Sequence, residues 1–173
     1  MMKAILPALA LALASTAPSL AQTYAVTNGR VVTNTDQGVI ADGTVLVRDG
    51  SIVAVGTDVT IPDGTEVIDA DGGWITPGLF APFTQIGLIE VALEGSTTDA
   101  GANDSPYSVA LDVTDGYNPA GTHIASTRMR GVTRAAIYPS TGHNIFAGQG
   151  GLVNTSGSAN SVFESGSFVY ADL

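Results

Sequence analysis

Short runs of β-prone residues, separated by turn residues, fill the chain from residue 24 to residue 69. Residues 25–33 predict a first strand, with Asn28-Gly29 at a bulge or tight turn. Residues 44–48 and 51–55 are two further β-rich runs, and Asp49-Gly50 joins them. An Asp-Gly pair between such runs favours a hairpin, because both central residues of a type I′ turn need a positive φ.

A third turn and a short strand complete this region. Pro62-Asp63-Gly64 predicts the turn, and residues 65–69 predict the strand that follows it. The pattern as a whole predicts a small antiparallel β unit.

The second half of the chain has a different pattern. Residues 79–83 form an apolar run that predicts a buried strand, directly after a turn at Pro77-Gly78. Asn118-Pro119 predicts a helix cap followed by Pro at the first helical position, and residues 120–129 predict the helix. Residues 132–138 are again β-prone. A strand, a helix and a strand in this order are typical of a parallel βαβ unit.

The first 21 residues are expected to be a secretory signal peptide. Lys3 supplies a positive start, residues 4–14 are apolar, and Ser19-Leu20-Ala21 places small residues at a cleavage site before Gln22. The apolar run is too short to span a bilayer, which disfavours the alternative of an N-terminal membrane anchor. We therefore expect a secreted or periplasmic protein without a membrane span after cleavage.

The net negative charge disfavours binding to polyanionic partners. Removal of Lys3 leaves five Arg against 16 Asp and Glu, a net charge of about −11 with His neutral. Nucleic acids and anionic membrane surfaces would repel such a chain. A small-molecule substrate or ligand fits the composition, and a homo-oligomer is compatible with it.

Three segments resemble the amidohydrolase superfamily, especially its imidazolonepropionase-like branch. They occur in the family's order and cover most of the chain after the signal peptide: residues 28–33 with 42–56, residues 67–80, and residues 131–144 with 148–150. The resemblance implies half of a β-sandwich in residues 22–75, followed in residues 76–173 by the start of a (β/α)₈ TIM-type barrel. Both domains would be incomplete in this chain, which favours a truncated piece of a longer protein over a chain that a partner completes.

The resemblance also locates a metal site, and the chain departs from it. The family's first barrel strand usually ends in His-x-His, whose two rings point the same way and hold a divalent metal. The matching residues are Phe83 and Gln85, and the Asp that often precedes the pair is Ala81. We therefore predict no metal or other cofactor in this chain, and a Zn²⁺ ion only if residues beyond Leu173 supply its ligands.

Three residues are candidates for contact with a substrate or ligand. Gln85 either hydrogen-bonds a ligand in a metal-free pocket or is a polar residue satisfied at a strand end. Asn144 and Gln149 lie in the Gly-rich stretch after Thr141, where the resemblance implies a loop near the barrel mouth. The three residues are the predicted substrate contacts, and no catalytic residue is predicted.

For the histidines and for one arginine cluster, a surface role is favoured over a binding site. His123 and His143, the two histidines, lack nearby carboxylates for a metal site. Arg128, Arg130 and Arg134 suit either an anion or a solvated helix end, with Arg134 paired to an acid.

Two functions remain in competition, with a third less favoured. The resemblance implies a hydrolase of non-peptide C–N bonds, of which this chain would be a piece that does not catalyse alone. Phe83 and Gln85 instead suggest a non-catalytic envelope protein that binds a small molecule or another protein. The third, a β scaffold for interactions, rests only on the N-terminal strands.

Overall fold

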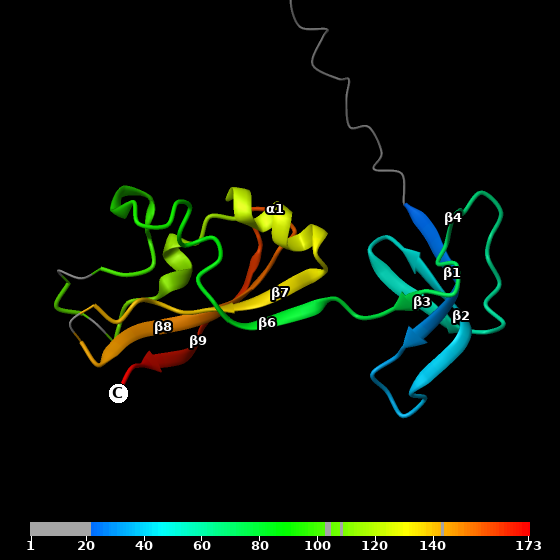
Figure 1. Ribbon diagram of the computed structural model, residues 1–173, viewed down its shortest axis with the longest axis horizontal. Helices are drawn as coiled ribbons and strands as arrows, with labels where there is room; N and C mark the ends of the chain where they lie inside the picture. Colours follow the sequence, from blue (N-terminus) through cyan, green and yellow to red (C-terminus); the bar gives the residue numbers. More distant parts are fainter. Residues whose placement is uncertain (1–21, 103–104, 108, 143) are drawn as a thin grey trace, which may run out of the picture. The chain divides into compact units, whose positions relative to one another are not determined.

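The computed structural model describes residues 22–102, 105–107, 109–142 and 144–173 (Figure 1). The chain forms two compact units that divide between Pro77 and Gly78. The expected signal peptide lies outside the described residues. No helix in the described ranges is long and apolar enough to cross a membrane.

The first unit is a five-stranded mixed sheet. Its strands are β1 (Thr23–Val32), β2 (Val39–Arg48), β3 (Ser51–Gly56), β4 (Glu66–Asp69) and β5 (Trp74–Ile75). β1 lies at the centre, with β2 antiparallel on one side and with β4 and β5 parallel on the other, while β3 extends the sheet beyond β2.

The predicted turn chemistry is confirmed in this sheet. The register of β1 against β2 shifts around Gly29, and Asn28 has a φ of 54°, so the expected bulge is present. Asp49 and Gly50 have φ values of 53° and 74° at the β2–β3 hairpin, as a type I′ turn requires.

The expectation of a purely antiparallel unit was wrong. β4 and β5 run parallel to β1. The turn at residues 62–64, closed by a hydrogen bond from Thr65 N to Pro62 O, sits within the longer connection between β3 and β4. This connection passes from beyond β2 to the far side of β1, so β4 enters the sheet in the direction of β1. A hairpin turn alone would have reversed the chain.

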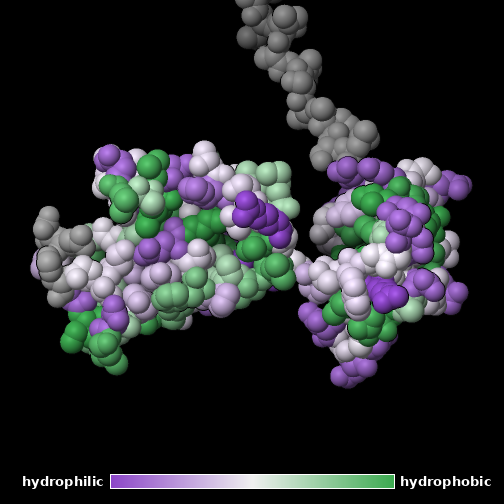
Figure 2. Space-filling view, in the orientation of Figure 1, coloured by the Kyte–Doolittle hydropathy of each residue, from purple (hydrophilic) through white to green (hydrophobic). Residues whose placement is uncertain are grey.

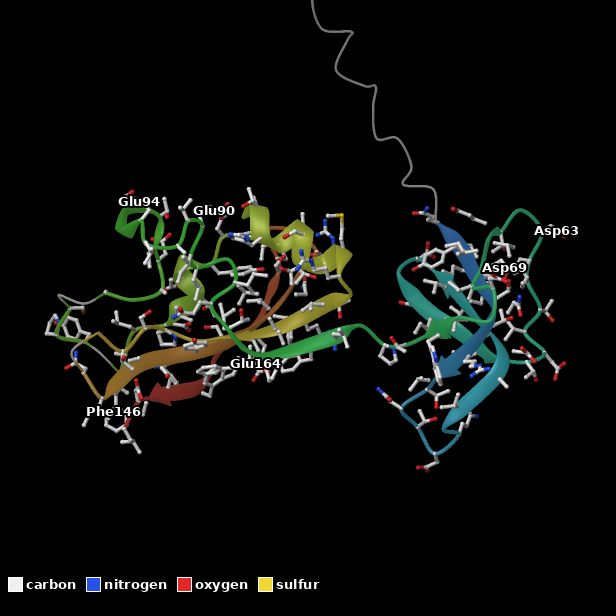
Figure 3. All side chains as sticks on the ribbon, viewed as in Figure 1. Asp63, Asp69, Glu90, Glu94, Phe146 and Glu164 are labelled. Carbon is white, nitrogen blue, oxygen red and sulfur yellow. The ribbon has the colours of Figure 1, made fainter. Side chains whose placement is uncertain are left out.

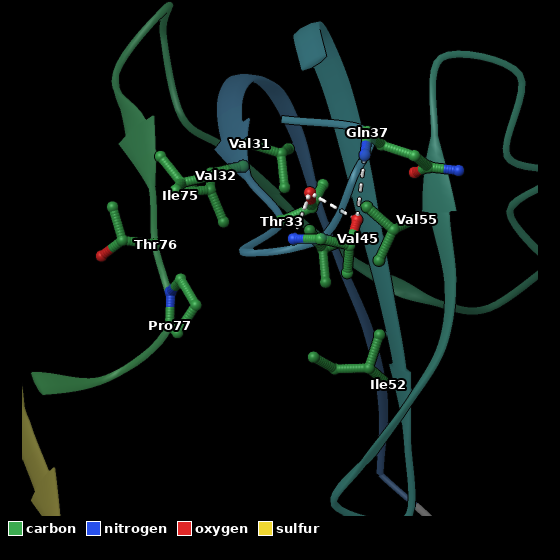
Figure 4. Close-up of a pocket in the computed structure, with 11 residues that line it drawn as sticks. Val31, Val32, Thr33, Gln37, Val45, Ile52, Val55, Ile75, Thr76 and Pro77 are labelled. Carbon is green, nitrogen blue, oxygen red and sulfur yellow. Dashed lines mark hydrogen bonds between the residues drawn. The ribbon is translucent and has the colours of Figure 1, made fainter. Parts of the chain in front are cut away.

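One face of this sheet carries the unit's small core and an open apolar cavity. Val31, Val45 and Val47 are buried, with Tyr24, Ile40 and Ile75 packed against them. The cavity has a volume of about 280 Å³, and Val31, Val45, Ile52, Val55 and Ile75 supply apolar parts of its lining (Figure 4). The Thr33 and Thr35 hydroxyls, 2.9 Å apart, lie on its polar side.

The second unit is a four-stranded sheet in the order β6-β7-β8-β9. Its elements are β6 (Leu79–Thr84), the 3-10 helices η1 (Gly95–Thr97) and η2 (Val113–Gly116), α1 (Thr122–Met129), β7 (Val132–Ile137), β8 (Phe146–Asn154) and β9 (Val162–Ala171). β6 and β7 are parallel with α1 between them in sequence, which confirms the predicted βαβ unit. β8 and β9 continue the sheet in antiparallel fashion.

β8 and β9 were not predicted. β8 contains Gly148, Gly150 and Gly151, and glycine is depleted in strands because it has no side chain to pack. In the folded chain, side chains of other elements occupy the space beside Gly150 and Gly151. The ring of Phe168 in β9 lies where a Cβ of Gly150 would be, and Thr114 in η2 occupies the same place at Gly151.

The predicted helix cap was also wrong. Asn118 Oδ1 accepts a hydrogen bond from Ala120 N in a turn ahead of the helix, and α1 begins only at Thr122. Gly121, at the N-cap position, has no side chain to cap with. Glu90 takes over this role, since its Oε1 accepts from Thr122 N at 2.9 Å and from Thr122 Oγ1 at 2.7 Å. Figure 3 shows Glu90 near the start of α1.

β6 is a strand as predicted, yet it is not buried. Leu79, Phe80 and Phe83 are 58%, 49% and 54% exposed, whereas Ala81 packs against the core. β6 is an edge strand of the described sheet, so fewer neighbours cover it. The core of the unit consists of the following buried residues: Leu88, Ala100, Val113, Tyr117, Ile124, Ala135, Ile137 and Val153. Apolar side chains also reach the surface of this unit (Figure 2).

Candidate functional site

The carboxyl ends of β6 and β7 bring Gln85 beside the residues that follow β7. The strands are parallel, so both end at the same edge of the sheet. Gln85 Nε2 donates to Ser140 Oγ at 2.9 Å and lies 3.5 Å from the Tyr138 carbonyl oxygen. The side chain of Gln85 is partly buried, and its amide nitrogen is satisfied within the protein. This contact links the first residue after β6 to the chain leaving β7.

Phe83 is held by aromatic packing. Its ring stacks on Tyr138 with centroids 3.6 Å apart and planes 5° apart, and Tyr170 of β9 lies tilted against both rings at 5.4 Å and 4.9 Å. Tilted pairs such as the two with Tyr170 contribute about 0.5–1.5 kcal/mol each beyond the area they bury. Partial desolvation, with Asp172 and Tyr138 nearby, raises the pKa of Tyr170, so its phenol stays protonated near neutral pH. The cluster therefore offers an apolar surface and a neutral hydroxyl.

The side chains at this edge do not fit a divalent metal. Phe83 offers ring carbons, and Gln85 and Ser140 offer an uncharged amide and hydroxyl that already bond each other. A Zn²⁺-like ion prefers imidazole, thiolate or carboxylate ligands. The described ranges contain no group of three or more His, Cys, Asp or Glu that could hold a metal ion.

Asn144 lies on the other side of Ser140. The two residues line one small cavity together with Thr141 and Phe146. Its volume of about 10 Å³ is scarcely enough for one water molecule. Gln85 and Asn144 therefore flank the same serine, but no substrate-sized space opens between Asn144 and Ser140.

Gln149 serves a different part of the fold. Its backbone N donates to Leu111 O at 2.7 Å, and its side-chain Nε2 donates to Val109 O at 3.3 Å. Both hydrogen bonds fasten the segment before η2 to β8. The structure thus brings Gln85 and Asn144 close to one serine, while Gln149 is engaged with the segment around Leu111.

Asp112 is a polar residue whose role sequence reasoning missed. Its Oδ1 accepts from Thr114 N at 2.9 Å and Thr114 Oγ1 at 2.7 Å, and its Oδ2 accepts from Ser165 in β9. Burial acts to raise the pKa of this carboxyl, but these bonds and one from the Gly166 backbone outweigh it and lower the pKa. The Asp-x-Thr spacing indicates the local turn, whereas nothing in the sequence reveals Ser165 as a partner.

Acidification is expected to weaken this contact. Because the folded-state pKa of Asp112 is lowered, the ionised carboxyl stabilises the fold above its unfolded pKa, and the stabilisation is lost as the pH falls through the lowered value. The effect should be small, since the carboxylate is partly exposed and screened by solvent. Urea unfolding of wild type and Asp112→Asn at several pH values measures it, and their difference should shrink at low pH. Asp115→Asn is the control, and a pH-independent difference for Asp112→Asn would contradict the assignment.

The remaining candidates do not contact the Gln85–Ser140 pair, although His123 lines a cavity together with Gln85. His123 is the second residue of α1, with Nε2 3.0 Å from the Glu90 carbonyl oxygen, and His143 lies outside the described residues. Arg128 donates to Thr155 O, whereas the guanidinium of Arg134 lies 5.9 Å from the ring centroid of Phe163. The expected pairing of Arg134 with an acid is replaced by this aromatic contact.

Comparison with known proteins identifies two curated relatives, each similar to about a third of the chain. No protein-family model matches the chain. It is 34% identical over 67 residues to an imidazolonepropionase of Mesorhizobium japonicum, a match covering 34% of this chain and 16% of that protein. It is 41% identical over 54 residues to a dihydroorotase of Citrifermentans bemidjiense, covering 31% of this chain and 12% of that protein.

A solved structure extends the match across both units. The amidohydrolase from Thermotoga maritima MSB8 aligns with 86% of this chain and 38% of its own, with a TM-score of 0.72 and 25% identity. The mixed sheets and few helices of this chain fit the N-terminal part of such a protein. The chain spans about a sixth or less of the two curated relatives and well under half of the solved one. It thus resembles the amidohydrolase superfamily and corresponds to part of the longer proteins it matches.

Proposed function

We propose that this chain is a portion of a secreted or periplasmic hydrolase that acts on non-peptide C–N bonds, and that the portion does not catalyse the reaction alone. Kinship with proteins named imidazolonepropionase, dihydroorotase and amidohydrolase supports the reaction class. The packing of Phe83 against Tyr138 and Tyr170 supports the proposal that this portion does not catalyse the reaction alone. A packed phenyl ring stands where the family resemblance implies a metal-binding histidine.

We further propose that each unit is part of a larger domain. The first unit would be one half of a β-sandwich, and β6, α1 and β7 the first part of a (β/α)₈ barrel. The open apolar face of the first sheet supports the former, and the parallel βαβ unit supports the latter. Any Zn²⁺ of the intact enzyme would be held by residues beyond Leu173.

A non-catalytic envelope protein that binds a ligand or a partner is the second candidate. The hydrogen bond between Gln85 and Ser140 favours it, because an amide engaged with a hydroxyl stands where the family resemblance implies a metal-binding imidazole. Such a protein would have the fold of the superfamily without its hydrolase activity.

Export is tested by the mature N-terminus. If residues 1–21 are a signal peptide, protein recovered from the periplasm or medium of an expressing bacterium should begin at Gln22. Intact-mass spectrometry measures this directly. Retention of residues 1–21 in membrane-bound protein would instead indicate an N-terminal anchor.

Metal loading tests the proposed loss of the first-strand ligands. The full chain, incubated with Zn²⁺ and then dialysed, is expected to retain far less than one equivalent and to hydrolyse neither the substrate of imidazolonepropionase nor that of dihydroorotase. The variant carrying both Phe83→His and Gln85→His should retain more Zn²⁺, since two imidazoles two residues apart restore part of a site. Elemental analysis gives the ratio. Stoichiometric Zn²⁺ in the wild-type chain, with hydrolysis abolished by a chelator, would refute the proposal.

A further inference from the structure

Two of the protein's five tyrosines touch each other on the second sheet. Tyr138 directly follows β7, and Tyr170 lies near the end of β9. Their ring centroids are 4.9 Å apart and their planes are tilted by 59°, which is the geometry of two aromatic rings in contact. Among the described residues, no other two tyrosines have their rings in contact. Both side chains are half-buried, so the protein holds the pair while solvent still reaches it.

The strand between these tyrosines explains how their rings meet. β8 separates β7 from β9, and strands two apart in a sheet lie about 10 Å from each other. A bulky side chain on the middle strand would keep the rings apart. Gly148 of β8 pairs with Tyr170, so no side chain of β8 stands at that position. Phe83 of β6 stacks flat on Tyr138 and fixes its ring from the other side.

The phenol groups of the pair interact as well as their rings. Partial desolvation raises the pKa of Tyr170, and the charges of Asp172 and of an ionised Tyr138 act in the same direction. A charge on one phenol opposes ionisation of the other appreciably only over a short distance. Oxidised phenols join through the ring carbons next to the carbon that bears the hydroxyl. Those ortho carbons are therefore near each other too.

Few other side chains would compete for a one-electron oxidant in this unit. The chain contains no Cys, whose thiol is readily oxidised, and its one Trp, Trp74, belongs to the first unit. Tyr117 is buried, and its hydroxyl donates a hydrogen bond to the Asn154 carbonyl oxygen. Tyr107 is 69% exposed but has no aromatic partner among the described residues. Tyr138 and Tyr170 are thus the tyrosines placed to react with each other.

We propose that Tyr138 and Tyr170 are the site of an intramolecular dityrosine bridge, formed when hydrogen peroxide oxidises the pair through a haem peroxidase. Each phenol loses one hydrogen atom, as a proton and an electron, and becomes a tyrosyl radical. A C–C bond then forms between one ortho carbon of each ring, and the two ortho hydrogens move to the phenol oxygens. The two hydrogen atoms removed at the start reduce one peroxide molecule to two water molecules. The proposal is independent of the hydrolase assignment, since it involves neither a metal site nor a substrate of that enzyme.

Treatment of the full chain with hydrogen peroxide and a haem peroxidase tests the proposal. The mass of the monomer should fall by that of two hydrogen atoms, and the fluorescence of dityrosine should appear. Peptide mapping should find one cross-link, between the peptides that contain Tyr138 and Tyr170. Oxidation of Met129 is distinguished by mass, because a sulfoxide adds an oxygen atom. Because the two rings are already in contact, the bridge should form at least about tenfold faster than dimers of the chain.

Removal of one phenol provides the decisive variant. Tyr170→Phe keeps an aromatic ring in the cluster and should lower the dityrosine yield at least about tenfold. Tyr107→Phe is the matched control and should leave the yield unchanged. Circular dichroism reports whether each variant is folded, and Tyr138→Phe decides the matter if Tyr170→Phe is not. The proposal is overturned if folded wild type forms no bridge, if the cross-link joins other tyrosines or two chains, or if a folded variant lacking one of the two phenols gives the wild-type yield.

The bridge is also expected to stabilise the second sheet. It links residues 138 and 170 and so ties β9 to β7, and a cross-link stabilises a fold mainly by restricting the unfolded chain. The bridged protein should unfold at a temperature at least about 5 °C above that of untreated protein. Treated Tyr170→Phe controls for oxidation at other residues and should show no such rise. An equal midpoint for bridged and untreated wild type would overturn this stabilising role.

Discussion

Gly150→Ala is expected to lower the free energy of unfolding of this protein by about 3 kcal/mol. A Cβ at this position would overlap the ring of Phe168 and would lie 2.6 Å from the carbonyl oxygen of Ile137. The carbonyl belongs to β7, which pairs with β8, so it cannot retreat without disturbing the ladder between the two strands. The ring of Phe168 would have to leave its place over β8. The loss thus combines overpacking with a weakened β8–β9 contact.

Urea unfolding followed by circular dichroism measures the effect of Gly150→Ala. Gly95→Ala is the matched control, because a Cβ at Gly95 meets nothing within 4 Å. We expect the control to change the stability by no more than about 0.5 kcal/mol. Equal unfolding midpoints for the two variants would show that β8 and β9 do not pack as the structure has them.

Ile124→Ala should have a comparable effect, with a loss of about 2–4 kcal/mol. Ile124 is 1% exposed and lies in the core with Leu88, Ala135 and Ile137. It is the only residue of α1 that is buried, so its truncation leaves the helix with little apolar surface against the sheet. An eight-residue helix is too short to be stable on its own in water. We therefore expect α1 to detach or fray as well as a cavity to form.

Met129→Ala is the control for this variant, since Met129 ends the same helix and is 82% exposed. Its stability should stay within about 0.5 kcal/mol of wild type. Amide hydrogen exchange adds a local measurement, because detachment predicts faster exchange in α1 for Ile124→Ala alone. Slow exchange of α1 in that variant would show that Glu90 and the helix ends hold it without Ile124.

Several local features followed directly from the residues. Asp49-Gly50 specified its hairpin and Asn28-Gly29 its bulge, because positive φ values at these positions depend on the dipeptide itself. Residues 132–138 specified β7 through their β-prone side chains. For the candidate site, the sequence singled out Phe83 and Gln85 by their departure from a family pattern. The turns and the strand depend on residues adjacent in sequence, and the two site positions were found by comparison with a family motif.

The tertiary structure decided everything that depends on partners distant in sequence. β4 pairs in parallel with the edge of β1 that β2 leaves free. The start of α1 is capped by Glu90, which lies 32 residues before Thr122. Ser140 became the partner of Gln85 only because β6 and β7 end side by side. The contact between Tyr138 and Tyr170 depends on Gly148 of the strand between them, which pairs with Tyr170. Hydrophobic periodicity describes one segment at a time, whereas packing and hydrogen bonding join segments whose proximity only the folded chain creates.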